Sequence, residues 1–216
     1  CVHRVEEIPW AVRKAMHELK SGRQRPVELE FPRDVMQNSG KVNDIEVTES
    51  ISPRSPELSH IKEAARLLSE AKKPVIWAGG GIISSDASRE LTLVAERLNA
   101  PVITTPEGKG AIPGNHPLSL GVFYSGYGPA HLTLPQADVI LVVGSRFYFS
   151  ARAPMSFRED QKLIQIDVDS AEIGRNNTIH LGIESDARIA LKLLLEALTK
   201  KSRSNWQAEE LDKIKY

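Results

Sequence analysis

Two kinds of hydrophobic pattern alternate between residues 57 and 200. Short runs that are apolar at nearly every position are predicted strands, and they fall at 75–78, 102–105, 139–143 and 163–167. Between them lie stretches with apolar residues at i, i+3, i+4 and i+7, the pattern of an amphipathic helix. Strands that are apolar on both faces and alternate with helices indicate a parallel sheet covered on both sides. We therefore predict an α/β domain with a doubly wound parallel sheet over residues 57–200.

Polar residues indicate where several of these helices begin. Pro56-Glu57 is expected to start the first helix, and Ser85-Asp86 and Ser185-Asp186 are expected to cap two later ones. A further helix is predicted near 128–136. The segment 106–121 is rich in Gly and Pro, so we predict a loop there.

The two ends of the chain do not continue this pattern. Residues 6–21 are predicted to form a helix and residues 26–31 a strand, but one helix and one strand cannot make a core. We therefore expect residues 1–36 to be the tail of a preceding domain: disordered, packed on the α/β domain or paired with a second copy. Residues 37–56 are expected to be a linker and residues 201–216 an exit linker. Because the first residue is Cys1 rather than Met, we expect the chain to be part of a longer protein.

Charge and cysteine content exclude several classes of protein. Lys plus Arg number 28 and Asp plus Glu number 28, so the net charge is 0, which removes the electrostatic argument for a nucleic-acid or membrane partner. Cys1 is the single cysteine, which excludes an internal disulfide and a Cys-ligated structural zinc site. No apolar run approaches the roughly 18 residues of a membrane span, and no signal peptide is recognisable. We expect a soluble, cytoplasmic protein.

Residues suited to bind a nucleotide follow three of the predicted strands. Gly79-Gly80-Gly81 follows the first, Gly144-Ser145-Arg146 follows the strand at 139–143, and Asp167 ends the strand at 163–167. In open parallel sheets, ligands bind at the carboxyl ends of the strands, where glycines admit a pyrophosphate and a carboxylate binds ribose. A second interpretation needs no ligand: the glycines form a tight turn, Arg146 is a surface or interface residue, and Asp167 caps a turn.

The sequence offers no catalytic constellation. The six histidines lack metal-ligand spacing, and there is no P-loop, no G-x-S-x-G elbow and no nucleophilic cysteine with a placed partner. No catalytic and no metal-binding residue is therefore predicted, and the chain by itself has the features of a binding module.

Several segments together resemble the thiamine-diphosphate-dependent enzymes of the acetolactate synthase (acetohydroxyacid synthase) type. Ser21-Gly22-Arg23 with Pro32-Arg33-Asp34 resembles the end of that family's pyrimidine-binding domain. Resemblance to the central domain is carried by further segments, at 72–81, 105–113, 116–121, 144–147 and 166–176. The last of these, Ile166-Asp167-Val168-Asp169 through Asn176, is the most specific to the group.

The resemblance implies a Rossmann-like central domain preceded by the tail of the pyrimidine-binding domain. In the parent enzyme, thiamine diphosphate and Mg²⁺ are held between the first and third domains of a homodimer or tetramer that acts on a 2-oxo acid. The activating glutamate and the G-D-G metal motif belong to those other domains, so the isolated chain is predicted to be inactive. The central domain of this family binds FAD in some members, ADP in others and nothing in several decarboxylases.

Carried over motif by motif, the resemblance implies a set of cofactor-binding positions. These are Arg23, Gly79, Gly80, Gly81, Thr105, Gly126, Tyr127, Gly144, Arg146, Phe147, Asp167 and Asp186. The sequence departs from the family after Phe147, where the usual R-F-D-D-R reads Arg146-Phe147-Tyr148-Phe149-Ser150 and both acids are missing.

Parts of the sequence also fit two other interpretations. In the first, the chain is a free-standing nucleotide-binding or regulatory module of the same fold. The segment Ala78 to Ser84 also resembles the G-A-G-I-S loop of NAD-consuming sirtuins, but those enzymes carry a Cys-x-x-Cys zinc pair that a chain with one cysteine lacks.

Overall fold

The computed structural model describes residues 1–41, 53–124, 128–149, 155–199 and 204–215. The chain divides into two compact units, residues 1–53 and residues 54–216.

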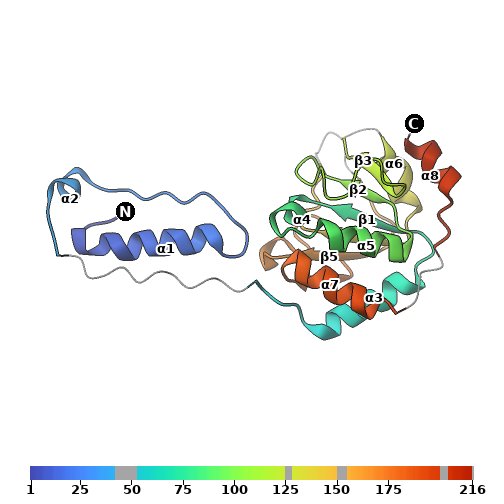
Figure 1. Cartoon of the computed structure of the whole chain (residues 1–216), viewed down its shortest axis with the longest axis horizontal. Coiled ribbons are helices and arrows are strands. Elements are labelled where there is room, and N and C mark those ends of the chain that lie inside the picture. Colours follow the sequence, from blue (N-terminus) through green and yellow to red (C-terminus); the bar gives the residue numbers. More distant parts are fainter. Residues whose placement is uncertain (42–52, 125–127, 150–154, 200–203, 216) are drawn as a thin grey trace. The chain divides into compact units, whose positions relative to one another are not determined.

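Unit 2 is built on a six-stranded sheet in the order β3-β2-β1-β4-β5-β6, with every neighbouring pair parallel (Figure 1). The strands are β1 Pro74–Ala78, β2 Val102–Thr104, β3 Ser119–Val122, β4 Val139–Val143, β5 Lys162–Asp167 and β6 Leu181–Glu184. Strand order reverses between β1 and β4, which makes their carboxyl ends the topological switch point of the sheet. The predicted doubly wound parallel sheet is confirmed.

Helices α3 (Leu58–Glu70), α5 (Ser88–Leu98) and α7 (Ala187–Ala197) lie side by side on one face of this sheet (Figure 1). Helix α6 (Pro129–Thr133) continues into a 3-10 turn, η2 (Leu134–Gln136), and contacts β3 and α8 (Ala208–Lys215). The helix predicted near 128–136 is therefore confirmed. A second 3-10 turn, η3 (Ser170–Glu172), follows β5.

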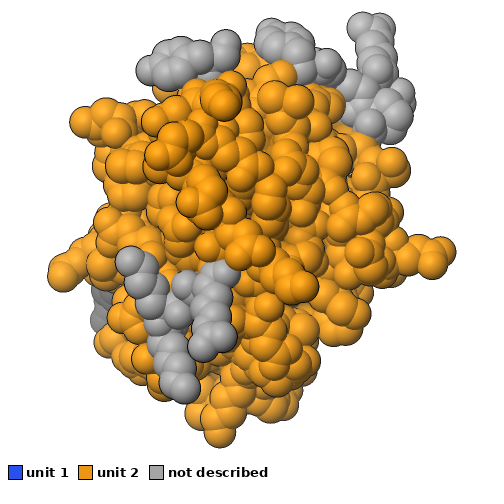
Figure 2. Space-filling view, turned by 90° about the vertical axis from the view of Figure 1, so that its right-hand side faces the viewer, with its two compact units in different colours: residues 1–53 blue, residues 54–216 orange. Residues whose placement is uncertain are grey.

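The core of unit 2 centres on β1 and β4, which are buried along their whole length. Their side chains point alternately to the two faces of the sheet, so burial of every residue requires cover on both faces. This explains why both strands are continuous apolar runs in the sequence. In space-filling form, unit 2 is one continuous mass of atoms (Figure 2).

Strands β3 and β6 were not predicted. Ser119–Val122 falls within and just beyond a segment expected to be a loop. For Leu181–Glu184, the sequence pattern predicted neither a strand nor a helix. Both are edge strands with a single pairing neighbour, and both contain a glycine. Short edge strands need few apolar residues, so the pattern on which the prediction relied is weak there.

The predicted cap at Ser85-Asp86 is wrong. A short helix, α4 (Gly80–Ser84), already occupies the turn after β1, and Ser85 lies at its carboxyl end, where its hydroxyl donates to the carbonyl of Gly81 at 2.6 Å. Asp86 has a positive φ of 53°, and α5 begins two residues later without a side-chain cap. The serine therefore ends one helix instead of starting the next.

The cap at Asp186 is confirmed. Its Oδ1 accepts hydrogen bonds from the backbone amides of Arg188 at 2.9 Å and Ile189 at 3.2 Å, at the start of α7. We expect Asp186→Ala to lower the free energy of unfolding by about 1 kcal/mol, because two first-turn amides lose their acceptor. Asp186→Asn keeps a carbonyl oxygen at that position and is expected to remain close to the unchanged chain. Urea unfolding followed by circular dichroism measures both, and equal losses in the two variants would contradict the capping role.

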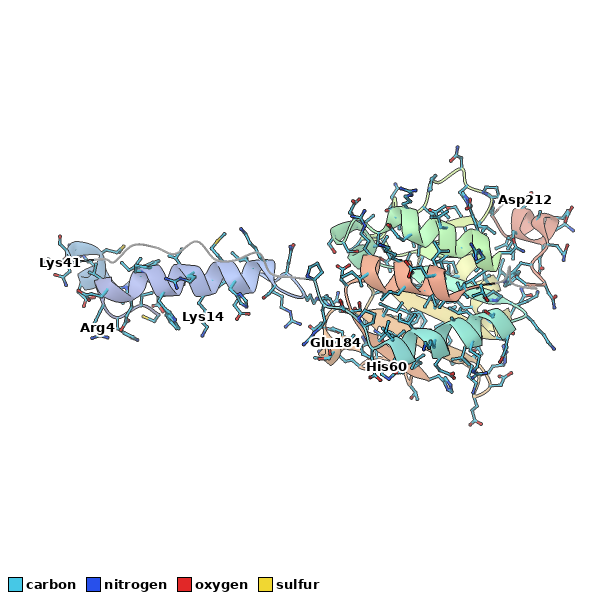
Figure 3. All side chains as sticks on the ribbon, turned by 60° about the horizontal axis from the view of Figure 1, so that its bottom comes forward. Arg4, Lys14, Lys41, His60, Glu184 and Asp212 are labelled. Carbon is cyan, nitrogen blue, oxygen red and sulfur yellow. The ribbon has the colours of Figure 1, made fainter. Side chains whose placement is uncertain are left out.

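Unit 1 contains η1 (Val5–Glu7), α1 (Ile8–Lys20) and α2 (Arg33–Gln37). The predicted N-terminal helix is confirmed, but the predicted strand at 26–31 is not a strand, because this extended segment has no β partner among the described residues of unit 1. It is held to the N-terminus by one backbone hydrogen bond, from Val2 N to Glu30 O at 2.9 Å. The side chains of Arg4, just before η1, and of Lys14 in α1 extend outward (Figure 3).

The described residues of the expected exit linker pack on unit 2. Trp206 is buried, and its indole Nε1 donates to the carbonyl of Pro74 at 2.9 Å. The Nζ of Lys73 lies 4.3 Å from the centre of the same ring, and Leu211 of α8 is buried as well. The segment 204–215 is thus part of unit 2.

A candidate nucleotide site at the carboxyl ends of the strands

The structure brings three of the candidate glycines together at the switch point of the sheet. Gly79 follows β1 and donates its amide to the carbonyl of Val143 at 2.9 Å; Gly81 donates to the carbonyl of Gly144 at 3.0 Å. A Cβ on Gly81 would lie 2.5 Å from the Cα of Gly144. A Cβ on Gly79 would lie 2.2 Å from the carbonyl oxygen of Gly144. The turns after β1 and β4 are therefore packed backbone against backbone, which supports the tight-turn interpretation of these glycines.

The loop after β2 closes on the same turn. The amide of Thr105 donates to the carbonyl of Ala78 at 2.9 Å, and its hydroxyl accepts from the amide of Gly108 at 3.1 Å. Gly108 in turn fits against β1 so closely that a Cβ there would lie 2.3 Å from the carbonyl oxygen of Ala78. Gly80 is partly exposed, and a Cβ on it would lie 3.0 Å from the Cβ of Glu107.

The two candidate carboxylates both bind backbone amides. Asp167 is buried at the end of β5, and its Oδ1 accepts from the amide of Asp169 at 3.0 Å. Asp186 caps α7, as described above. The turn-capping interpretation of Asp167 is thus supported by a hydrogen bond.

Arg146 and Phe147 follow β4 and have opposite environments. Arg146 is exposed, and its guanidinium makes no hydrogen bond or ion pair within the part of the chain that the structure describes. Phe147 is buried and has a positive φ of 48°. A bulky residue in this region of backbone space is strained, so surrounding contacts must hold it there.

Sequence reasoning missed an aromatic cluster beneath this loop. It consists of Trp77, Phe123, Phe147, Phe149 and Phe157. Ring centres of Trp77 lie 5.0 Å from Phe123, 5.3 Å from Phe147 and 5.3 Å from Phe149, mostly in tilted or edge-to-face geometry. Phe157 stacks on Phe147 at 5.1 Å. The signal in the sequence was Phe149, which stands where the family usually carries an acid.

Three candidate residues lie outside the described part of unit 2. Arg23 lies in unit 1. Gly126 and Tyr127 lie outside the described residues.

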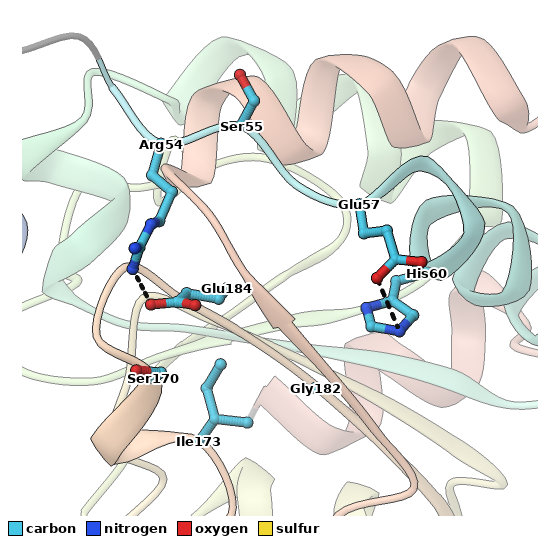
Figure 4. Close-up of a pocket in the computed structure, with 8 residues that line it drawn as sticks. All are labelled: Arg54, Ser55, Glu57, His60, Ser170, Ile173, Gly182 and Glu184. Carbon is cyan, nitrogen blue, oxygen red and sulfur yellow. Dashed lines mark hydrogen bonds and ion pairs between the residues drawn. The ribbon is translucent and has the colours of Figure 1, made fainter.

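A surface pocket of about 370 Å³ lies on unit 2 beside the edge strand β6 and next to the carboxyl end of β5 (Figure 4). Its charged side chains pair with one another: Arg54 with Glu184, and the Nε2 of His60 with the Oε2 of Glu57 at 3.7 Å. Glu184 and His60 lie at the opposite end of unit 2 from Asp212 of α8 (Figure 3). Within this pocket, the opposite charges of Arg54 and Glu184 compensate each other.

Two kinds of structure are absent from the described residues. None of their helices has the length and hydrophobicity needed to cross a bilayer. No group of three or more His, Cys, Asp or Glu side chains among them is arranged to hold a metal ion.

The chain is similar to large subunits of acetolactate synthases. It is 36% identical to the probable acetolactate synthase large subunit of Methanococcus aeolicus, over 95% of this chain and 36% of that protein. It is 34% identical to the acetolactate synthase isozyme 3 large subunit of Escherichia coli, over 93% of this chain and 36% of that protein. The chain therefore spans about a third of the length of these relatives.

A solved structure has the same fold. The benzoylformate decarboxylase of Polynucleobacter necessarius superposes with a TM-score of 0.82 at 27% identity, over 94% of this chain and 39% of that one. Residues 61–194 match the family model described as "Thiamine pyrophosphate enzyme, central domain". These residues make up more than half of the chain, and the chain belongs to that family.

Proposed function

We propose that this chain is the central part of a thiamine-diphosphate-dependent enzyme of the acetolactate synthase type. Such an enzyme joins or cleaves bonds next to the carbonyl of a 2-oxo acid, and it works as a homodimer or tetramer. Support comes from relatives that match nearly all of this chain and are named as acetolactate synthase large subunits. The chain covers about a third of their length, and we infer that the residues that perform the reaction lie in the other parts of such an enzyme.

The described residues do not fit the diphosphate and Mg²⁺ of the catalytic cofactor. A diphosphate–Mg²⁺ site needs oxygen ligands gathered around the ion, and the described part of the chain offers no cluster of carboxylates or histidines for it. We therefore assign no residue of this chain to thiamine diphosphate and derive no catalytic step from it.

For the carboxyl edge of the sheet we propose a site for a nucleotide diphosphate, either ADP or the ADP half of FAD. The observation that carries this proposal is Arg146: an exposed guanidinium without a partner in the described chain, one residue beyond the switch-point turn. An arginine there suits a diphosphate because its planar group donates two parallel hydrogen bonds to phosphate oxygens. An FAD bound in this way would bring a flavin able to exchange electrons, while the residues of this chain bind and orient the nucleotide.

One observation favours a second candidate, a purely structural role for the domain. The glycines of the switch-point turns fill each other's space, and Phe147 and Phe149 belong to a packed aromatic cluster. A spacer domain needs those features and no ligand.

Calorimetric titration with ADP, FAD and NAD separates the two candidates. Removal of a charge-assisted contact costs roughly 1.5–3 kcal/mol, so we expect Arg146→Ala to weaken ADP binding by about 10- to 150-fold. Arg89→Ala serves as the control, because Arg89 is equally exposed on α5 and also lacks a partner in the described chain. Absence of heat with all three ligands at millimolar concentration would leave the structural role.

A further inference from the structure

Three consecutive backbone carbonyls after β4 each accept a hydrogen bond from a side-chain amide. Gln165 Nε2 donates to the carbonyl of Ser145 at 3.1 Å. Asn176 Nδ2 donates to the carbonyl of Arg146 at 2.7 Å, and Asn177 Nδ2 to that of Phe147 at 2.6 Å. We call Gln165, Asn176 and Asn177 the amide clamp. It joins the loop after β4 to β5 and the loop that follows β5.

Gln165 and the start of the loop after β5 are themselves held in place. Gln165 is buried in β5; its Nε2 also donates to the carbonyl of Glu172 at 3.1 Å, and its Oε1 accepts from the amide of Gly174 at 2.9 Å. The side chain of Asp169 caps η3 by accepting from the amide of Ala171 at 3.1 Å. The loop after β5 is thus tied to its own strand before it reaches across to the neighbouring loop.

The clamp acts on a strained piece of backbone. Phe147 has a positive φ of 48°, a conformation that is strained for a residue other than glycine. Within the same loop, the hydroxyl of Ser145 accepts hydrogen bonds from the amide of Phe147 at 3.2 Å and from the indole Nε1 of Trp77 at 3.1 Å. Arg146 lies between these two held residues, with its own carbonyl in the clamp and its guanidinium exposed.

We propose that Gln165, Asn176 and Asn177 are positioning residues that set the conformation of residues 145–147 and thereby the affinity of Arg146 for a nucleotide diphosphate. The part that concerns affinity rests on the proposed nucleotide site; the part that concerns the loop does not. A fixed arginine loses less conformational freedom when it binds phosphate than one on a mobile loop, so it binds more tightly.

The affinity is tested in the full chain with ADP as the probe. We expect the double variant Asn176→Ala/Asn177→Ala to weaken ADP binding on the order of 5- to 10-fold. This range reflects the loss of two neutral hydrogen bonds, whose effect reaches ADP only through Arg146. In a chain that already carries Arg146→Ala, the same pair should change affinity less than 2-fold, because the clamp acts through that arginine. Thr178→Ala is the matched control: Thr178 is exposed in the same loop and has no hydrogen bond within the described chain.

The loop conformation is tested without nucleotide, by hydrogen–deuterium exchange of the amides of residues 145–149. We expect exchange to be faster in the double variant, and in Asn176→Ala alone, than in Thr178→Ala. Equal exchange in all three would overturn the proposal. So would a loss of ADP affinity that persists undiminished in the Arg146→Ala background, since the clamp would then not act through Arg146.

Failure of the proposed nucleotide site would give a different result. If the unchanged chain binds no ADP and the double variant still exchanges faster, the nucleotide site is wrong and the loop-setting role of the clamp stands. Thermal unfolding of each variant, followed by circular dichroism, identifies any change that reflects global unfolding instead.

Discussion

Replacing Gly144 with alanine is expected to lower the free energy of unfolding of the chain by about 3 kcal/mol or more. A Cβ at this position would lie 2.5 Å from the Cα of Gly81, and the atom it meets is main chain, which cannot rotate away. The φ of Gly144 is +59°, a region that alanine adopts only with strain. Since a domain is stable by about 5–15 kcal/mol, such a loss removes a large share of the total.

Urea unfolding of Gly144→Ala measures this loss, with Gly114→Ala as the control. Gly114 lies in an exposed turn where a Cβ meets nothing within 4 Å. We expect that variant to stay within about 0.5 kcal/mol of the unchanged chain. Similar midpoints for the two variants would show that the turns after β1 and β4 are not in close contact.

The second large effect is expected at Trp77. This side chain is almost fully buried in β1 and contacts three rings of the aromatic cluster. Trp77→Ala leaves a cavity that its neighbours fill only in part, and we expect a loss of about 3–5 kcal/mol. Trp77→Phe retains an aromatic ring and loses the hydrogen bond to Ser145, so its effect should be clearly smaller.

Trp10 provides the control for Trp77. It lies on α1 with 60% of its surface exposed, and its main described contact is the Nζ of Lys14, 5.1 Å from the ring centre. Trp10→Ala is therefore expected to leave the denaturation midpoint of unit 2 nearly unchanged. If Trp77→Ala were as mild as Trp10→Ala, the cluster would not be part of the core.

The central strands were predictable because their environment is uniform. A strand buried on both faces, such as Val139–Val143, has an apolar residue at every position, and few other structures produce that pattern. The edge strand Leu181–Glu184 alternates and contains a glycine, so its sequence does not differ from that of a loop. Likewise, Ser85-Asp86 has the composition of a helix cap, but the glycines before it form a helix of their own and end there.

For the candidate site, the sequence predicted only which residues follow the end of each strand. Knowing where each strand ends placed the glycines, Arg146 and Asp167 at one edge of the sheet. Whether a glycine makes room for a ligand or for another turn depends on its neighbour in space. The neighbour of Gly81 is Gly144, in the turn after a strand far along the chain. The amide clamp was hidden for the same reason, because Asn176 and Asn177 gain their role only once β5 lies beside β4.

The contact between Gly81 and Gly144 also predicts which positions of this domain can vary. Most packed sites tolerate exchange, because a larger side chain at one place can be matched by a smaller one beside it. Here both partners are already the smallest residue, so no second substitution can restore the fit. In a library of variants selected only for folding, we expect almost only glycine at these two positions. At the positions of the aromatic cluster around Trp77, we expect several compatible combinations of large side chains.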